Sequence, residues 1–196
     1  MTQDMACTSD NMASLIIKMF EPKYQQEASD LYRNGINSYQ HTGSCHALSS
    51  SRFTKRLTPG GDIYDIDAYF MKGRADNGKK RCFWVALLDD KVVGIVGAVP
   101  STKFGDDYLE LVRMSVSATC RKCGVGSRLL ATIEAWAKEQ GYSRMNLYTL
   151  DKFTLAVDLY MKNGYALHST VVYDVTDELQ LNKPEFVNIV HFVKVL

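Results

Sequence analysis

The sequence has no long apolar run. Its longest apolar segments, residues 82–88 and 92–99, have the length of strands, whereas a helix needs about 20 apolar residues to cross a bilayer. Residues 1–14 are polar and do not contain the apolar core of a signal peptide. We therefore expect a soluble, cytoplasmic protein without a membrane partner.

Charge of one sign is not in excess, since 23 basic and 22 acidic residues give a formal net charge of +1. This balance argues against bulk binding of nucleic acid. The sequence also lacks internal repeats, low-complexity tracts and linkers, and 196 residues fit one domain. We expect a flexible N-terminus over residues 1–14 and a single domain over residues 15–196.

The five cysteines do not form a recognisable framework. An odd number fits poorly with a set of disulfides, and the pair Cys120 and Cys123 has no second pair and no histidine nearby. A reducing compartment is the better interpretation. We expect no bound metal, and any role of Cys120 and Cys123 stays open.

The most informative segment is residues 113–130, where a strand pattern leads into Arg121-x-x-Gly124-x-Gly126 and then into a helix pattern. Backbone N–H groups in such a turn, followed by a helix N-terminus, form a site for an anion such as a pyrophosphate. A P-loop is excluded because no lysine stands between Gly126 and Ser127. A dinucleotide fingerprint is excluded because Leu129 stands at its third glycine position.

The remaining patterns predict an α+β domain with a mixed central sheet. Residues 41–53 and 63–72 are weaker helix patterns, and the basic segment 74–81 reads as a solvated loop. The clearer patterns are strands over 15–20, 82–88, 92–99, 108–117, 144–149, 165–175 and 186–195, and helices over 24–35, 126–140 and 151–162.

Two segments resemble a known family. The strand, Arg-x-x-Gly-x-Gly turn and helix resemble motif A of the GNAT superfamily of acetyl-CoA-dependent N-acetyltransferases, and residues 156–165 resemble its motif B. The resemblance implies the GNAT fold, with about seven strands flanked by helices. It also implies acetyl-CoA as co-substrate and direct acetyl transfer to a primary amine. The cofactor-binding residues that it implies are Met114, Ser115, Val116, Arg121, Lys122, Cys123, Gly124, Val125, Gly126 and Ser127.

The resemblance also implies two catalytic residues. Glu110 stands six residues before Val116, where several members carry a glutamate that deprotonates the amine. The alternative is a solvated acid beside Asp106 and Asp107. Tyr160 stands where members of the family carry a tyrosine that protonates the departing thiolate of coenzyme A. The alternative is an aromatic side chain that only packs.

Within the superfamily, residues 15–35, 83–86 and 110–111 are similar to the camello-like N-acetyltransferases. Those proteins usually carry an apolar membrane segment after the first helix, whereas residues 41–56 are polar here. A second departure is Phe153, where many relatives carry an asparagine. His168 and His191 are interpreted as structural or surface residues without a role.

The acceptor is not readable from the sequence. A small-molecule amine is the favoured acceptor, a protein lysine or N-terminus is the alternative, and a non-catalytic CoA-binding module also stays open. A homodimer is compatible with the sequence.

Overall fold

The computed structural model describes residues 11–37, 52, 54–73 and 78–196. The weak helix pattern at 41–53 falls outside these residues except for Arg52, and so do residues 1–10 of the expected N-terminal segment. In the described part of the chain, no helix is long and apolar enough to cross a membrane.

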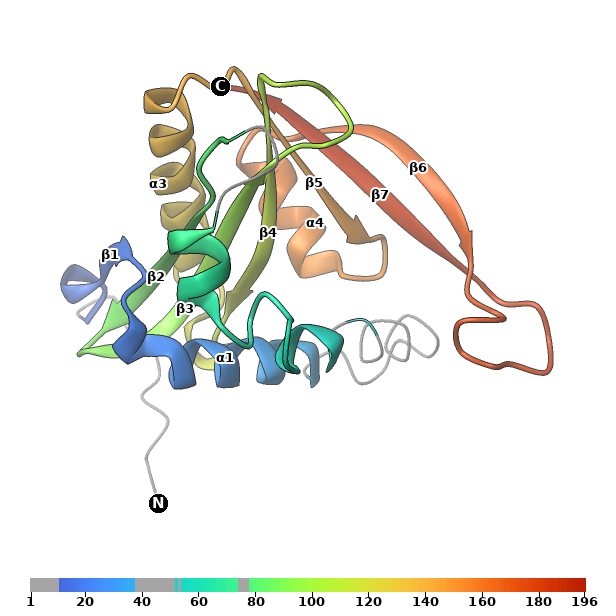
Figure 1. Ribbon diagram of the computed structural model, residues 1–196, viewed down its shortest axis with the longest axis horizontal. Coiled ribbons are helices and arrows are strands. Elements are labelled where there is room, and N and C mark those ends of the chain that lie inside the picture. The colour runs from blue at the N-terminus through green and yellow to red at the C-terminus, as the bar shows by residue number, and fades with distance from the viewer. Residues whose placement is uncertain (1–10, 38–51, 53, 74–77) are drawn as a thin grey trace.

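Seven strands form one mixed sheet, as predicted, and their order in the sheet is β1-β2-β3-β4-β5-β7-β6 (Figure 1). Neighbouring strands are antiparallel except β4 and β5, which are parallel. The last strand of the chain lies between β5 and β6, and this order was not predicted. The strands are β1 (Ile16–Met19), β2 (Cys82–Leu88), β3 (Lys91–Pro100), β4 (Tyr108–Val116), β5 (Arg144–Leu150), β6 (Ala166–Asp174) and β7 (Phe186–Val195).

Helices cover both faces of the sheet (Figure 1). In α3 (Val125–Glu139), a stripe that includes Leu129, Ile133 and Trp136 is buried in one core cluster. On the opposite face, α1 (Gln25–Asn37) covers a second cluster. The other helical segments are α4 (Thr154–Lys162), the 3₁₀ turns η1 (Asn11–Ser14), η2 (Pro22–Tyr24), η3 (Lys55–Leu57) and η5 (Ala118–Cys120), and the π-helical segment η4 (Asp67–Lys72).

The two parallel strands in the middle of the sheet diverge. Their ladder has three pairs and ends with Glu110 of β4 opposite Asn146 of β5. Beyond this pair β4 stays bonded to β3, and β5 stays bonded to β7. Buried backbone N–H and C=O groups need partners, so the edge of β4 after Glu110 is open to a ligand with amide groups. The strands therefore diverge beside Met114, Ser115 and Val116, which the family resemblance assigns to the cofactor.

A bulge changes the faces of β4 just after this point. Arg113 and Met114 face one residue of β3, and Arg113 has a φ of +59°. The extra residue reverses the alternation of side chains. Val112 packs in the cluster under α1, and Ser115, three positions later, lies on the same side against Gly35 of α1.

Candidate active site

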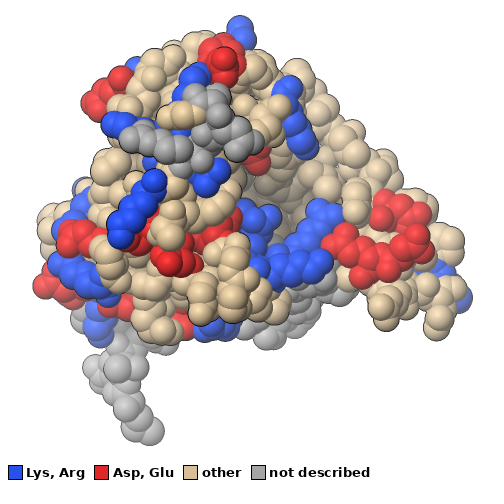
Figure 2. Space-filling model, in the orientation of Figure 1, with Lys and Arg blue, Asp and Glu red and all other residues tan. Residues whose placement is uncertain are grey.

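A cavity of about 640 Å³ lies where β4 and β5 diverge. Its walls come from α1, η3, β4, β5, the turn before α3, and α4. Figure 2 shows the molecule hollowed in this view, with Lys and Arg side chains gathered along one edge of the hollow. The cavity therefore connects the glycine turn to the opposite, α1 side of the sheet.

The structure brings most of the predicted cofactor residues to this cavity. Two of them, Cys123 and Val125, do not line it. Val125 is instead buried in the core. The residues that line it are Met114, Ser115, Val116, Arg121, Lys122, Gly124, Gly126 and Ser127.

The turn before α3 has the geometry of an anion site. Lys122 and Gly124 both have positive φ angles, +62° and +87°, a backbone arrangement that lets successive N–H groups converge. Gly124 is the N-cap residue of α3 and offers no side chain to cap the helix, and the first turn contains no acidic residue. The N–H groups and the positive end of the helix dipole are therefore available to an anion.

Gly126 has a packing role that the sequence did not reveal. A Cβ built on Gly126 would lie 3.0 and 3.2 Å from the two terminal methyl carbons of Leu159. The glycine thus lets α3 and α4 approach each other closely beside the turn. Asn163, just after α4, adds a hydrogen bond to the Oγ of Ser127 at 3.0 Å.

The backbone of β4 next to the turn is partly used by the protein itself. Nε of Arg121 donates a hydrogen bond to the carbonyl oxygen of Val116 at 3.2 Å. The family resemblance implied both Arg121 and Val116 as cofactor-binding residues. The structure shows that the two residues also bond to each other, which fixes the turn against the end of the strand.

Glu110 does not lie in a solvated loop before a strand. It is the third residue of β4 and is half-buried in the cavity wall at the point where β4 and β5 separate. Burial raises the pKa of its carboxyl, and the charges of Lys103 and Arg56 oppose that rise. A carboxylate with a raised pKa in a cavity is a better proton acceptor than a solvated one.

Tyr160 both packs and faces the cavity. It is only 5% exposed, and its ring lies 5.8 Å from that of Tyr165 and 6.2 Å from that of Phe192, centroid to centroid. The residue also lines the cavity. The packing role and the proposed catalytic role are therefore compatible.

Three arginines of the cavity wall were missed by the sequence analysis. Arg52 and Arg56 come from a segment without a recognisable motif, and Arg113 comes from the bulge in β4. Strict alternation along β4 would have placed Arg113 on the α3 side with Leu111. No signal in the sequence marks the extra residue of the bulge.

His191 is not a surface residue, although no role was assigned to it. It is 2% exposed and is stacked between Phe104 and Tyr148, with ring centroids 4.8 and 4.6 Å away. Burial lowers the pKa of His191, and the charges of His168 and Lys103 lower it further. The folded protein therefore favours the neutral imidazole.

This shift predicts a loss of stability in mild acid. Because folding lowers the pKa of His191, the unfolded chain binds a proton here more readily than the folded one. The free energy of unfolding is therefore unaffected by this group above pH 6.5, its ordinary pKa, and decreases as the pH falls below that value. We expect His191→Gln to reduce the decrease in the free energy of unfolding over this range, measured by urea denaturation at a series of pH values. His168→Gln should remove only the smaller part of the acid slope that the charge of His168 causes, since His168 itself is exposed. An unchanged acid slope in His191→Gln would show that other groups cause it.

Among the described residues, no three His, Cys, Asp or Glu side chains gather as a metal ion would require. The expected absence of a metal stays a prediction.

The geometry of the strands, the turn and the cavity agrees with the comparisons to known proteins. The chain belongs to the acetyltransferase (GNAT) family, which it matches over residues 44–165. It is 37% identical over 120 residues to the probable N-acetyltransferase camello of Xenopus tropicalis, covering 61% of this chain and 49% of that protein. It is 33% identical over 106 residues to human N-acetyltransferase 8, covering 53% and 44%. Rat N-acetylaspartate synthetase is 36% identical over 104 residues, covering 53% and 32%. The chain thus spans about half or less of the length of these relatives.

Solved structures confirm the predicted fold. A GCN5-related N-acetyltransferase from Kribbella flavida superposes with a TM-score of 0.67 at 17% identity, covering 94% of this chain and 99% of that one. An acetyltransferase from Bacillus anthracis, solved in complex with acetyl coenzyme A, superposes with a TM-score of 0.51 at 22% identity, covering 59% and 63%.

Proposed function

We propose that this protein transfers the acetyl group of acetyl-CoA directly to the primary amine of a small molecule. The observation that supports this most is one continuous cavity that contains the open edge of β4, the uncapped glycine turn, Glu110 and Tyr160. A binding module needs only the first two features. The carboxyl and the phenol add the two groups that amide formation from a thioester uses.

The residues present fit acetyl-CoA. The N–H groups of the turn from Arg121 to Ser127, together with Arg121 and Lys122, suit its pyrophosphate. The open edge of β4 at Met114 and Ser115 suits the amide chain of its pantetheine. When bound there, acetyl-CoA supplies an acetyl group activated as a thioester.

Two side chains of this protein would move protons. An amine with a pKa near 10 is mostly protonated at neutral pH and must lose a proton before it attacks a carbonyl carbon. Glu110 accepts that proton, directly or through a water molecule. Tyr160 donates its hydroxyl proton to the departing sulfur. The amine itself forms the new C–N bond, so no serine or cysteine nucleophile is needed.

The experiment that tests the proposal combines a titration with a turnover assay. Isothermal calorimetry with acetyl-CoA measures binding, and release of free thiol from acetyl-CoA measures transfer to a panel of small amines and lysine-containing peptides. Binding together with transfer to small amines supports the proposal. Binding without any transfer indicates a CoA-binding module, and transfer confined to peptides indicates a protein acetyltransferase.

Replacing Glu110 should affect turnover in a pH-dependent way. We expect Glu110→Gln to lower kcat by about a hundredfold at neutral pH, as for loss of a general base, and by less at alkaline pH, where the amine is already neutral. Steady-state rates over this pH range provide the measurement. Asp158→Asn is the control, since it removes another carboxylate from the edge of the same cavity. An equal loss at every pH would assign Glu110 a structural role instead.

A further inference from the structure

The cavity has a second cationic wall, away from the glycine turn. Arg56 and Arg113 line it on the α1 side of the sheet, where the bulge in β4 turns Arg113 toward Asp62. The cofactor turn, by contrast, precedes α3 on the opposite face. This second group of cations therefore lies on the side from which the acceptor amine would have to enter.

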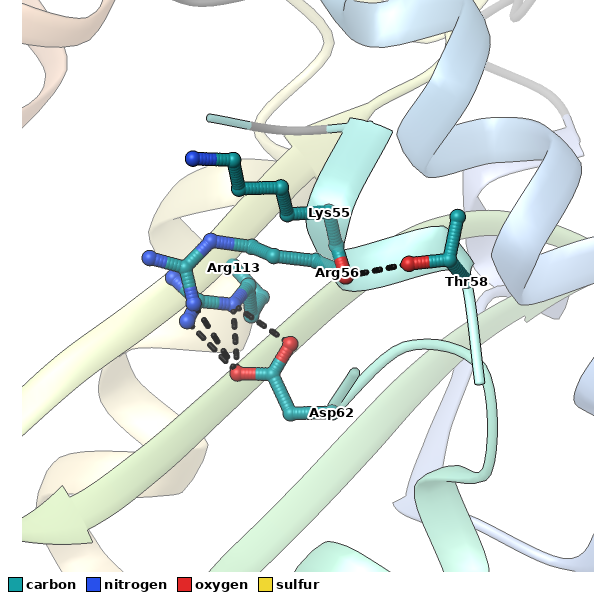
Figure 3. Close-up of polar contacts among 5 residues, drawn as sticks. All are labelled: Lys55, Arg56, Thr58, Asp62 and Arg113. Carbon is teal, nitrogen blue, oxygen red and sulfur yellow. Dashed lines mark hydrogen bonds and ion pairs between the residues drawn. The ribbon is translucent and has the colours of Figure 1, made fainter. Parts of the chain in front are cut away.

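Asp62 holds both guanidinium groups in place (Figure 3). Nε and Nη2 of Arg113 donate to its carboxylate at 3.0 and 2.6 Å, and Nη1 of Arg56 donates to the same oxygen at 3.2 Å. Asp62 is 7% exposed. Because bonds to a buried carboxylate restrict both side chains, neither arginine needs to be ordered by its ligand.

The loop that carries these groups is itself anchored. The N–H groups of Ile63 and Tyr64 both donate to the carbonyl oxygen of Arg56, at 3.1 and 2.9 Å. From α1, Gln25 and Ser29 donate to the carbonyl oxygen of Ile63, at 2.8 and 3.1 Å. Arg56 and Asp62 are therefore positioned by a network of hydrogen bonds to α1.

Arg113 has an unfavourable backbone conformation at this position. Its φ of +59° is uncommon for a residue with a side chain, because the left-handed region favours glycine. Its side chain is 15% exposed, so most of it is enclosed. A strained, enclosed arginine on the wall of a cavity is better explained by a ligand than by surface solvation.

The charges do not cancel. Asp62 offers one negative charge to two guanidinium groups, so these three side chains together carry one net positive charge. Arg52, the third arginine of the wall, is instead neutralised by a two-bond contact with Glu178 at 3.0 and 2.9 Å. An anionic group is the complement of the excess charge, and guanidinium groups match the two oxygens of a carboxylate.

We infer that the acceptor is an amine that also carries a carboxylate, bound by Arg56 and Arg113 while its amine faces Glu110. This inference rests on the proposed function. It gives each charge of the acceptor a partner of opposite sign in one cavity. Arg56 and Glu110 line the same cavity, and the positive charge of Arg56 lowers the pKa of the Glu110 carboxyl against the rise that burial causes.

The test compares acceptors that differ only in this charge. Each of the common L-amino acids and its own carboxamide is assayed separately as an acceptor with acetyl-CoA. Taurine and an aminophosphonate are assayed in the same way, as amines that carry a different anionic group. We expect kcat/KM to be about ten- to a hundredfold higher for carboxylates than for their carboxamides, as for hydrogen bonds between charged groups. Equal values for each pair, or a preference for taurine, the phosphonate or peptide amines, would overturn the inference.

Variants assign the preference to the cationic wall. Arg56→Gln should remove most of the ratio between carboxylate and carboxamide by raising KM, and Arg56→Lys should retain part of it. Lys55→Gln is the matched control, because it removes a cation from the same turn η3 without lining the cavity. A ratio that survives in Arg56→Gln would contradict the assignment. Arg113→Gln is less suitable, since it leaves Asp62 buried without its main partner.

A binding measurement separates the inference from the proposed function. Calorimetric titration of the CoA-loaded protein with the best amino acid and with its carboxamide reports the site without any turnover. If the protein binds acetyl-CoA and the amino acid but transfers nothing, the proposed function fails and the carboxylate site stands. If it acetylates amines without regard to the carboxylate, the inference fails and the proposed function stands.

Discussion

Gly126→Asp is expected to abolish acetyl-CoA binding by a folded protein. The new carboxylate would lie in the first turn of α3, where the uncapped N–H groups and the helix dipole favour an anion. It would thereby occupy the place proposed for the pyrophosphate and repel it. The new Cβ would also press on Leu159 of α4 at 3.0 Å. Calorimetric titration with acetyl-CoA, with circular dichroism to verify folding, measures the effect.

Two further variants separate charge from packing. Gly126→Ala introduces only the contact with Leu159, whose terminal methyl carbons must shift by a few tenths of an ångström. Because no charge is added, binding should be weakened but retained. Ala131→Asp places the same new charge on an exposed position of α3, remote from its first turn, and should bind acetyl-CoA as the parent does. Unchanged affinity in a folded Gly126→Asp variant would refute the proposed anion site.

The parts of the fold that could be predicted are those with a local pattern. Residues 82–99 show two β-rich runs around a short polar turn, and the structure forms β2 and β3 there. The helix predicted over 126–140 is α3, displaced by one residue. The strand predicted over 186–195 is β7, with the same bounds. In each case periodicity and turn residues within the segment suffice.

The parts that could not be predicted depend on contacts between distant residues. Nothing in residues 186–195 tells that this strand inserts between β5 and β6. The bulge at Arg113 adds one residue to an otherwise regular strand pattern, and this residue decides which face receives the arginine. Arg56, Asp62 and Arg113 come together only because the loop after η3 folds back on β4. The Arg-x-x-Gly-x-Gly turn, in contrast, is encoded in consecutive residues and was recognisable.

Glu110 illustrates the same limit within the site. The family resemblance suggested a catalytic carboxylate at Glu110, and the alternative was a solvated acid beside Asp106 and Asp107. The structure places it opposite Asn146, a fully buried residue, at the last pair before the strands diverge. Its burial, and with it the raised pKa of its carboxyl, follows from the pairing of β4 with β5 and from the covering residues, which no local pattern specifies.

Tyr160→Phe is expected to reduce turnover by about ten- to a thousandfold while acetyl-CoA binding stays near normal. As the amine attacks the thioester, the departing sulfur gains negative charge, and a phenol of ordinary acidity is still protonated at neutral pH and can donate to it. Phenylalanine keeps the ring between Tyr165 and Phe192, so the substitution removes the hydroxyl and little else. Single-turnover rates and calorimetric titration measure the two quantities separately.

The control for this variant is Tyr165→Phe. Tyr165 belongs to the same aromatic cluster and is 3% exposed, but it does not line the cavity, and its hydroxyl contacts the sulfur of Met145 at 3.7 Å instead. Loss of this buried hydroxyl can change the free energy of unfolding. It does not affect protonation of the departing sulfur, so turnover should match that of the parent. The loss caused by Tyr160→Phe should also shrink with an acyl donor whose leaving group has a lower pKa, because such a group needs less help from an acid. If both variants turn over like the parent with acetyl-CoA, the thiolate leaves unassisted or another group protonates it, and the assignment of Tyr160 as the acid is wrong.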